Sequence, residues 1–292
     1  MYPPLTPPQS VSIELSDGYV CFARYWPPAQ PASAATLYLH GIQSHGGWYE
    51  WSASAIAAET GGAVLMPDRR GSGRNPAPRG DVARAGRWIA DVAELTAWLQ
   101  RKSGATSINC AGVSWGGKLA AAYCQRKSPE APQFASLLLI APGMFPQVDL
   151  KWFEKLGVGI ALIREPSAPF KLPLQEPELF TDNPAGQRFI ADDNLKLTHC
   201  TARFLIESRG LDRRLQRATR ADWLPPTTLL LAEDDRIIRS KITAAWLERV
   251  ATRPSRIVYF AGSAHTLEFA ADRQQFAAEL RHWAAKLPRH GG

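Results

Sequence analysis

The sequence predicts an α/β protein whose mostly parallel sheet is flanked by helices and interrupted by an inserted helical segment. Two observations support this prediction. Short apolar runs alternate with longer helical stretches, and these runs are apolar throughout, as expected for parallel strands buried on both faces. The alternation stops near Gly143 and resumes at Thr227, and the stretch between them is rich in prolines, charges and isolated aromatic residues.

The predicted elements follow one another in a regular order. A proline-rich arm comes first, and polar and apolar residues then alternate around Asp17-Gly18, which is typical of a β-hairpin. The next elements are strand 36–41, helix 49–61, strand 63–68, helix 86–102, strand 107–113, helix 115–127 and strand 135–141. After the interruption come strand 227–232, helix 240–251, strand 255–262 and an amphipathic helix around 272–287. We therefore expect residues 1–143 and 223–292 to form the core domain and residues 144–222 to form a helical cap.

Composition excludes several classes of protein. Hydrophobic residues make up 45% of the 292 residues, enough for a sizeable core. The net charge of +7 comes from dispersed arginines without a helix-turn-helix, zinc or arginine–aromatic pattern, so we expect no nucleic-acid partner. The four cysteines lack metal-ligand spacing, and no basic and apolar leader or run of about 18 apolar residues stands out. We expect reduced thiols, a cytoplasmic location and no metal or organic cofactor; the oligomeric state stays open.

The segment "GVSWGG", residues 112–117, holds the first candidate for chemistry. Ser114 lies between Gly112 and Gly116 at the end of a predicted strand, giving the pattern G-x-S-x-G. Such a turn is sharp and strained and tolerates no bulky neighbours, and it presents the serine hydroxyl at the start of a helix. In an open parallel sheet, ligands bind at this edge. Ser114 is therefore a candidate nucleophile.

A serine hydroxyl needs a base that is itself oriented by a third group. Of the six histidines, His265 in "GSAHTLEF" follows the last predicted strand and lies downstream of both the serine and a strand-end acid. That acid comes from "LLLAEDDRII", where Asp235 is our choice, with Asp234 second and Glu233 third. The chain order Ser114, Asp235, His265 is that of serine hydrolases built on an α/β sheet.

An oxyanion hole would complete this site, because negative charge develops on the substrate's carbonyl oxygen. The backbone N–H of Trp115 is one expected donor, and that of Ile42, in "HGIQSHGGWY", is the other. We expect His40 and Gly41 of the same segment to lie at the substrate site, with His40 orienting the loop through hydrogen bonds. A metal held by His40 and His45 is the weaker alternative, because a third ligand is lacking.

These motifs together resemble serine hydrolases of the α/β-hydrolase superfamily, and within it the monoacylglycerol lipase and lysophospholipase group, also labelled serine aminopeptidase S33. The resemblance rests on "HGIQSHGGWY", "PDRRGSGRN", "GVSWGG", "AEDDRII" and "GSAHTLEF". It implies an eight-stranded, mostly parallel sheet with an inserted helical cap, and the hydrolase roles of Ser114, Asp235 and His265. Two features depart from the group: Trp115 replaces a common methionine, as in some polyester depolymerases and acyltransferases, and the insert shows no match to the lipase lid.

Four further features each have two interpretations. Asp68 contacts substrate or, as we favour, forms a loop-bracing ion pair with Arg69 or Arg70. Trp48 and Tyr49 wall the substrate pocket or pack the start of a helix. The apolar residues of the insert accept an acyl chain or pack in the core; they are Trp152, Phe153, Leu156, Val158, Ile160 and Leu162. The arginines of "RGLDRRLQRATR" contact a membrane or form a solvated face; they are Arg213, Arg217 and Arg220.

The sequence thus predicts a serine hydrolase that cleaves carboxylic esters through an acyl-enzyme. The apolar stripe of the insert favours a lipid-like small-molecule substrate, of the monoacylglycerol or lysophospholipid type. Three alternatives stay open: an acyltransferase that uses the same triad, a non-catalytic ligand-binding protein with this fold, and an amidase.

Overall fold

The protein is described by a computed structural model that covers residues 5–28, 33–76, 78–126, 130–220 and 223–287. Eight strands form one sheet in the order β1-β2-β4-β3-β5-β6-β9-β10. Strand β2 is antiparallel to β1 and β4, and the other neighbouring pairs are parallel, which confirms the predicted sheet. The strands are β1 (Gln9–Glu14), β2 (Val20–Trp26), β3 (Ala34–Leu39), β4 (Ala63–Pro67), β5 (Ser107–Val113), β6 (Phe134–Ile140), β9 (Thr227–Ala232) and β10 (Ser255–Phe260).

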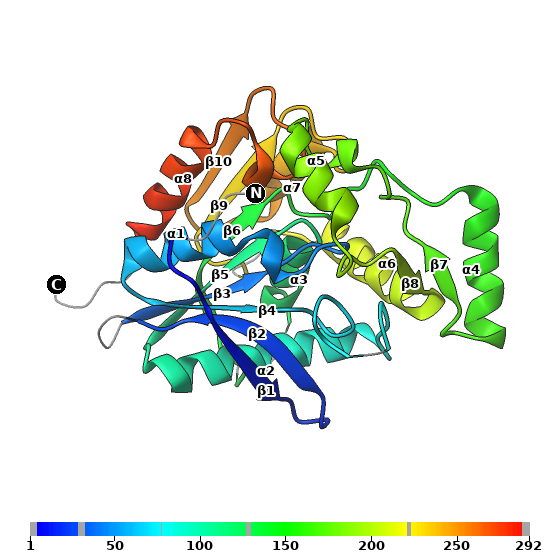
Figure 1. Cartoon of the computed structure of the whole chain (residues 1–292), viewed down its shortest axis with the longest axis horizontal. Helices are drawn as coiled ribbons and strands as arrows, with labels where there is room; N and C mark the ends of the chain where they lie inside the picture. Colours follow the sequence, from blue (N-terminus) through cyan, green and yellow to red (C-terminus); the bar gives the residue numbers. More distant parts are fainter. Residues whose placement is uncertain (1–4, 29–32, 77, 127–129, 221–222, 288–292) are drawn as a thin grey trace.

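Helices cover both faces of this sheet. Helices α1 and α8 pack against each other on one face, and α2 and α3 lie together on the other (Figure 1). Every residue of β3, β4 and β9 is buried, which explains why these strands are apolar throughout. The flanking helices are α1 (Glu50–Thr60), α2 (Ala85–Ser103), α3 (Trp115–Cys124), α7 (Ser240–Val250) and α8 (Gln274–Ala284), and the 3-10 helices are η1 (Gly46–Trp48), η2 (Pro177–Leu179) and η3 (Leu267–Phe269).

The predicted hairpin at the start of the chain is confirmed. Strands β1 and β2 pair in register from Gln9 opposite Tyr25 to Glu14 opposite Val20. Gly18 turns the chain with a φ of 77°, a backbone conformation that glycine adopts without steric cost.

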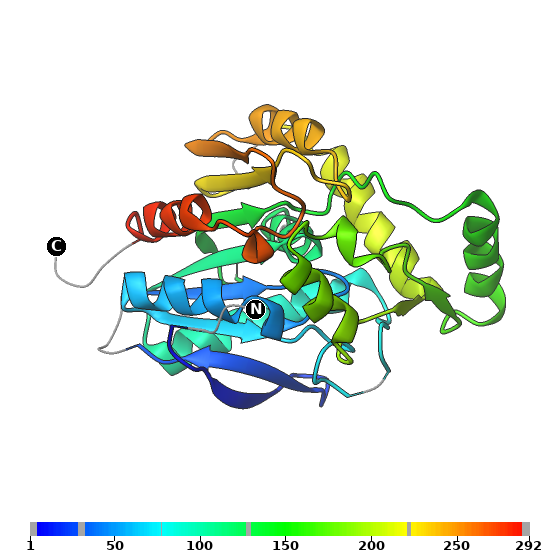
Figure 2. The same cartoon turned by 45° about the horizontal axis from the view of Figure 1, so that its top comes forward.

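The chain between β6 and β9 builds a separate layer beyond one edge of the sheet (Figures 1 and 2). It consists of α4 (Trp152–Arg164), β7 (Pro169–Lys171), η2, α5 (Pro184–Asp192), β8 (His199–Thr201) and α6 (Ala202–Gln216), with β7 and β8 paired antiparallel. Helix α6 packs on α2 and α3, whereas α4 contacts α6 and lies farthest from the sheet in both views. We call this layer the cap; its boundaries at 144 and 222 stay predictions.

The apolar stripe predicted in the insert does not pack as expected. Val158 is buried, but most of the remaining apolar side chains of α4 point to solvent, Trp152 being 77% and Ile163 88% exposed. The reason is helical periodicity: residues 152, 156, 160 and 163 fall on one side of α4, and Val158 falls on the side that faces α6. We call the exposed side the outer face of α4; it comprises Trp152, Phe153, Leu156, Ile160 and Ile163.

The four cysteines are buried as free thiols. Across the described ranges, no helix combines the length and the apolar character that crossing a bilayer requires.

Candidate active site

Ser114 occupies a strained turn between β5 and α3. Its φ of 51° and ψ of −119° lie in a region that non-glycine residues rarely adopt. Backbone hydrogen bonds hold this conformation: the N–H of Ser114 donates to the carbonyl of Ile140 at 2.9 Å, and its carbonyl accepts from the N–H of Gly143 at 2.8 Å. The strand-to-helix turn is therefore clamped by the segment that follows the neighbouring strand β6.

The glycines of the motif are required by close backbone approach. A Cβ atom on Gly116 would lie 2.2 Å from the carbonyl oxygen of Leu39, and one on Gly112 would lie 2.8 Å from that of Gly116. Neither position has room for a side chain, because the obstructing atoms belong to the backbone. This packing brings the start of α3 directly against the end of β3 and explains the G-x-S-x-G pattern.

Asp235 and His265 form a buried pair at the carboxyl ends of β9 and β10. His265 Nδ1 lies 2.8 Å from Asp235 Oδ2, and both side chains are almost fully buried. The other carboxylate oxygen accepts the backbone N–H groups of Ile237 and Ile238 at 2.8 and 2.9 Å. With three donors around it, this carboxylate is fixed and acts only as an acceptor, so the imidazole carries its proton on Nδ1.

The opposite nitrogen of His265 is left as an acceptor. Nε2 is buried and has no hydrogen-bond partner among the described residues. A buried polar atom without a partner is costly, and such atoms in native proteins commonly serve chemistry or bind a ligand. Of the three carboxylates that follow β9, Asp235 is buried next to His265, whereas Glu233 and Asp234 are exposed.

The loop after β3 runs alongside Ser114. A Cβ atom on Gly41 would lie 3.4 Å from the Cβ of Ser114, so the loop passes within van der Waals distance of the serine. His40 Nε2 accepts the backbone N–H of Arg69 at 2.7 Å, and its Nδ1 therefore donates to the carbonyl of Gly41 at 2.8 Å. Burial, aided by the charge of Arg69, holds the pKa of His40 well below its usual range, so the ring is neutral. His40 braces the loop; contact of His40 and Gly41 with substrate stays a prediction.

The side chain of Arg69 holds this loop in place through hydrogen bonds, a role that was not predicted from the sequence. Its Nη1 donates to the carbonyl of Gly41 at 2.8 Å and its Nη2 to that of Ile42 at 2.7 Å. The guanidinium also stacks over the indole of Trp115, 4.7 Å from the ring centroid. Burial lowers the pKa of Arg69 to about 10, so it remains charged at neutral pH. One side chain thus contacts both segments that hold the expected oxyanion donors.

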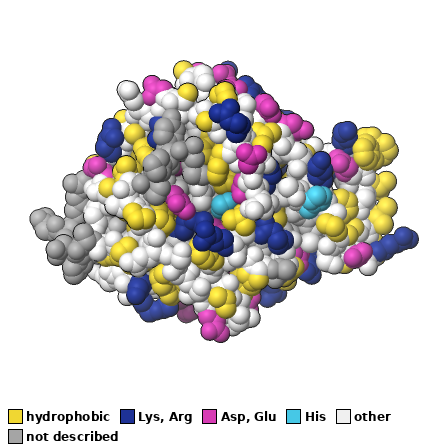
Figure 3. All heavy atoms as spheres, in the orientation of Figure 1, with side chains coloured by type: hydrophobic (Ala, Val, Ile, Leu, Met, Phe, Trp, Pro, Cys, Tyr) yellow, Lys and Arg dark blue, Asp and Glu magenta, His cyan; other side chains and the backbone are white. Residues whose placement is uncertain are grey.

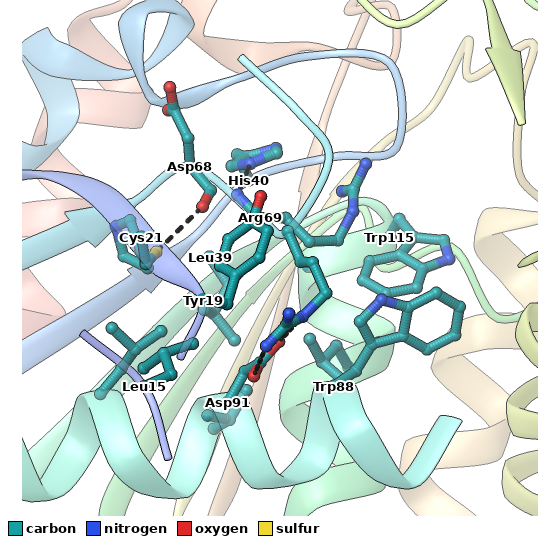
Figure 4. A pocket seen from close by; sticks show the side chains of 16 residues that line it. Leu15, Tyr19, Cys21, Leu39, His40, Asp68, Arg69, Trp88, Asp91 and Trp115 are labelled. Carbon is teal, nitrogen blue, oxygen red and sulfur yellow. Dashed lines mark hydrogen bonds and ion pairs between the residues drawn. The ribbon is translucent and has the colours of Figure 1, made fainter. Parts of the chain in front are cut away.

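The ion pair predicted between Asp68 and Arg69 or Arg70 is wrong. Asp68 instead pairs with Arg24, whose Nη1 lies 2.9 Å from Oδ1, and accepts the backbone N–H of Gly46. Arg70 pairs with Asp91 at 2.8 Å. Figure 4 shows the physical reason for Arg69: its guanidinium extends toward Trp115, while the carboxylate of Asp68 lies apart from it. Asp68 is fully buried and braces the fold.

Trp48 and Tyr49 lie inside the protein. Trp48 packs edge-on against Phe180, and its indole N–H donates to Asp193 at 2.7 Å. The Tyr49 hydroxyl donates to Ser44 at 3.2 Å and lies 3.6 Å from where a Cβ on Gly41 would stand. These contacts show that Trp48 and Tyr49 pack inside the protein. Neither residue lines the cavity next to Ser114.

This cavity, which we call the Ser114 cavity, has a volume of about 370 Å³ and lies between the core and the cap. Its walls include Ser114, Ile42 and Trp115 together with apolar side chains, namely Val148, Leu150, Val158, Leu172, Leu174, Leu205, Ile206, Ile237 and Ile238. The internal space shown in Figure 4, about 30 Å³, is too small for a substrate.

The cavity also contains a polar cluster that sequence reasoning missed. Lys118, on α3, is buried, and its Nζ lies 2.8 Å from Asp212 Oδ1 and 2.9 Å from Ser208 Oγ, both on α6. The indole N–H of Trp115 donates to the same Ser208 hydroxyl at 2.9 Å. Burial lowers the pKa of Lys118 and raises that of Asp212. A lysine within the apolar helix "WGGKLAAAYC" was the signal available.

Comparison with solved structures shows the fold to be that of the α/β-hydrolases. A monoacylglycerol lipase from Paleococcus ferrophilus is 18% identical, with a TM-score of 0.76 over 90% of this chain and 98% of that one. A soluble variant of monoglyceride lipase from Saccharomyces cerevisiae is 15% identical, with a TM-score of 0.85 over 98% of this chain and 97% of that one. At these identities the likeness shows the fold alone.

The sequence defines the family more narrowly. Residues 30–272 match the family described as "Serine aminopeptidase, S33", and the chain belongs to this family, as its motifs predicted. It is also 31% identical over 108 residues to a proline iminopeptidase of Lactiplantibacillus plantarum. That match covers 37% of this chain and 36% of the other protein, so the chain spans about a third of the length of the curated relative that it matches.

Proposed function

We propose that the protein is a serine hydrolase that cleaves carboxylic esters through an acyl-enzyme. The observation that carries the proposal is the state of His265. Its Nδ1 is bonded to the fixed carboxylate of Asp235, and its Nε2 is buried without a partner among the described residues. Ser114 lies at the same edge of the sheet, because the carboxyl ends of parallel strands share one edge. In this site Ser114 is the nucleophile and His265 its base.

The reaction follows from these roles. Nε2 of His265 takes the proton of the Ser114 hydroxyl as Oγ bonds to the ester carbonyl carbon, and Asp235 stabilises the imidazolium that forms. The imidazolium then gives its proton to the departing alkoxide, which leaves as the alcohol. Water, deprotonated by the same nitrogen, attacks the acyl-enzyme, and collapse of this second intermediate releases the acid and restores the serine.

The developing oxyanion would be bound by the backbone N–H groups of Trp115 and Ile42. Arg69 supports this role for Ile42, because it binds the Gly41 carbonyl, which belongs to the same planar peptide group as the Ile42 N–H, and the Ile42 carbonyl as well. Gly143 supports the role of Trp115, since a Cβ there would lie 3.2 Å from the Trp115 nitrogen and crowd the donor. Preorganised donors of this kind are each worth several kcal/mol in the transition state.

The apolar walls of the Ser114 cavity favour a lipid-like ester, such as a monoacylglycerol or lysophospholipid. The lipase names of the two structural neighbours agree with this choice. A cytoplasmic location stays a prediction.

Hydrolysis of p-nitrophenyl esters of increasing acyl length tests the proposal directly. We expect measurable turnover that Ser114→Ala abolishes while the circular dichroism spectrum is retained. The exposed Ser10 in β1 offers a matched control, because Ser10→Ala should keep full activity. Turnover that is unchanged in Ser114→Ala would refute the assignment.

Three alternatives remain and can be separated in the same assay. Addition of a competing alcohol, followed by product analysis, distinguishes an acyltransferase, which would form a new ester instead of the acid. A non-catalytic binding protein would leave every substrate intact. Proline p-nitroanilide belongs in the panel because of the partial similarity to a proline iminopeptidase, and its cleavage would indicate an amidase.

We also propose peripheral contact with an anionic membrane surface, made by the outer face of α4. This face leaves Trp152, Leu156 and Ile163 more than half exposed, and hydrophobic side chains gather at this end of the molecule in Figure 3. The exposed cations Lys151 and Arg164 lie at the two ends of α4, which suits anionic lipid headgroups. Arg213, Arg217 and Arg220 lie on α6 or after it and not on α4, and membrane contact through these arginines stays a prediction.

Sedimentation with vesicles of equal parts phosphatidylserine and phosphatidylcholine tests this contact. Replacing Trp152 and Ile163 by serine should lower the partition coefficient about tenfold, since apolar area no longer enters the interface. Val20→Ser, which removes an exposed apolar side chain from β2, is the control and should leave binding unchanged. Absence of binding by the native protein, or a native dimer that the double substitution dissociates, would contradict the proposal.

A further inference from the structure

We propose that the Ser114 cavity selects amphipathic esters that carry an anionic group, a carboxylate or a phosphate, and binds that group at a cationic cluster. The cluster consists of Lys118, Lys155, Arg209 and Arg213, all of which line the cavity. The inference rests on the proposed ester hydrolysis and names the substrate class within it.

Lys118 is the deepest member of the cluster. It is four residues after Ser114, so its side chain starts one helical turn, about 5.4 Å, along α3 on the same face. In the described part of the chain its Nζ donates to Ser208 and forms an ion pair with Asp212, so Lys118 is the buried positive charge of the cluster.

The other cations lie toward the cap. Arg209 and Arg213 are four residues apart on α6 and therefore project from one side of that helix. Arg209 lies 3.6 Å from Asp212 and 3.7 Å from Asp149, and Lys155 lies 2.7 Å from the same Asp149. The side chains of Arg209 and Lys155 are 42% and 51% exposed, so this part of the cluster forms the rim of the cavity.

The charges that line the cavity do not balance. Four cationic side chains face two carboxylates, Asp149 and Asp212, which leaves a formal excess of two positive charges. The buried Lys118 faces the buried Asp212, so the excess lies on Lys155, Arg209 and Arg213 at the exposed rim, where a bound anion would compensate it. Guanidinium groups also present paired donors that match the geometry of carboxylate and phosphate.

The apolar side chains complete the description of the ligand. Leu172, Leu174 and Ile237 line the same cavity, so one molecule can place hydrocarbon against them and its anionic group against the cluster. A neutral ester would satisfy the apolar walls but would leave the cationic excess uncompensated. The cavity therefore fits an ester with a negative charge a short chain away from the scissile carbonyl.

A matched pair of substrates tests the inference. The p-nitrophenyl monoester of adipic acid and p-nitrophenyl hexanoate share six acyl carbons and the leaving group, and they differ in the charge at the far end. We expect kcat/KM about tenfold higher for the anionic ester at low salt, with the ratio falling as ionic strength rises. Monoesters of succinic, glutaric and suberic acid then report the distance from Ser114 to the cluster.

A second substrate pair places the anion on the alcohol side of the ester. A monoacylglycerol is compared with the same acyl glycerol bearing a 3-phosphate. Preference for the phosphate compound alone assigns the cluster to the alcohol side, and preference for the adipate ester alone assigns it to the acyl side. A ratio of one or less in both pairs would overturn the inference.

Substitutions locate the effect. Arg209→Gln should lower the anionic-to-neutral ratio several-fold, and Arg188→Gln, which removes an exposed arginine of α5 outside the cavity, should leave the ratio unchanged. Lys118→Met would strand the buried Asp212, so the double variant Lys118→Met/Asp212→Asn is used, with its circular dichroism spectrum compared with that of the native protein. A preference that survives in both the Arg209 and the double variant would show that the cluster does not bind the anion.

Binding measured without turnover separates this inference from the proposed function. Calorimetry with the Ser114→Ala protein compares monoethyl adipate with ethyl hexanoate. We expect the anionic ester to bind about tenfold more tightly and Arg209→Gln to weaken it. If no ester is hydrolysed, the proposed function fails, yet binding that depends on Arg209 would still support the anionic site; equal binding of both esters would refute it.

Discussion

Charged side chains are held in different ways at the Ser114 end of the core and at the rim of the cap. In the core, Asp235 and Arg69 are buried, and their partners are mostly backbone groups at fixed positions. In the cap, Lys155 and Asp149 are about half exposed and pair with each other across the rim of the cavity. Rigid partners favour precise geometry, whereas exposed pairs rearrange at little cost. The fixed groups of the core therefore suit the proposed chemical step, and the exposed rim of the cap suits the proposed choice of substrate.

Removing the charge of Asp235 should have the largest effect on the core. Asp235→Asn keeps the shape of the side chain but removes its negative charge. It no longer holds the proton of His265 on Nδ1 or stabilises the imidazolium, so we expect kcat for ester hydrolysis to fall about 10⁴-fold. Asp234→Asn is the matched control, because that neighbouring carboxylate is exposed, and it should retain activity within about twofold. Both variants are assayed for kcat on a p-nitrophenyl ester. Equal losses would contradict the assignment of Asp235, rather than Asp234, as the partner of His265.

Glu268 provides a pH-dependent test of the core. Burial raises its pKa from 4.5 to about 7. The folded protein therefore binds one more proton than the unfolded chain between these values, and its stability falls as pH rises through this window, by about 3 kcal/mol in all. Glu268→Gln removes the titrating group while keeping an acceptor for the Ser52 N–H.

Denaturant unfolding of the two proteins at pH values from 4.5 to 8 measures this difference. The variant should gain stability relative to the native protein as the pH rises, and the two should converge near pH 4.5. A constant difference across the window would mean that Glu268 does not titrate there.

The support given by Arg69 predicts a smaller loss of activity. Arg69→Lys keeps the charge but replaces the planar guanidinium, whose two nitrogens serve the Gly41 and Ile42 carbonyls separately, by a single ammonium nitrogen, so the loop is held less firmly. We expect kcat to fall on the order of tenfold with KM little changed, since the loss concerns the transition state. Arg70→Lys alters a residue that pairs with Asp91, away from the loop, and should leave kcat intact. A change in KM alone would argue against the proposed role of Arg69.

The smallest effect should be found in the cap. Lys155→Gln removes an ion pair with Asp149 whose side chains are 51% and 43% exposed. We expect the free energy of unfolding to change by less than about 1 kcal/mol. A larger loss, measured by urea unfolding, would mean that the cap is as tightly built as the core.

The same contrast explains what could be predicted from the sequence. The strands of the core and the turn at Ser114 follow from local patterns, because buried parallel strands are apolar throughout and the turn needs Gly112 and Gly116. The choice among the three carboxylates after β9 is less certain from the sequence, because all three follow the same strand. In the structure Asp235 is buried, whereas Glu233 and Asp234 are exposed.

Contacts between distant segments could not be predicted. The sequence predicts an ion pair of Asp68 with its chain neighbours Arg69 or Arg70, whereas the carbonyl acceptors of Arg69 lie 27 and 28 residues away from it. The Lys118–Asp212 pair joins two helices whose contact depends on how the cap packs on the core. The exposed side of α4 could not be predicted, because α4 is apolar on two sides and its packing on α6 and Phe170 decides which side is buried.

The central claim is that Ser114 is activated by His265. Labelling with a fluorophosphonate, followed by mass spectrometry of the modified peptide, tests it without knowledge of the natural substrate. We expect the native protein to be labelled at Ser114 and the His265→Ala variant to react at least about 100-fold more slowly, because the general base is lost. Labelling at another residue, or equal rates in the two proteins, would contradict the account.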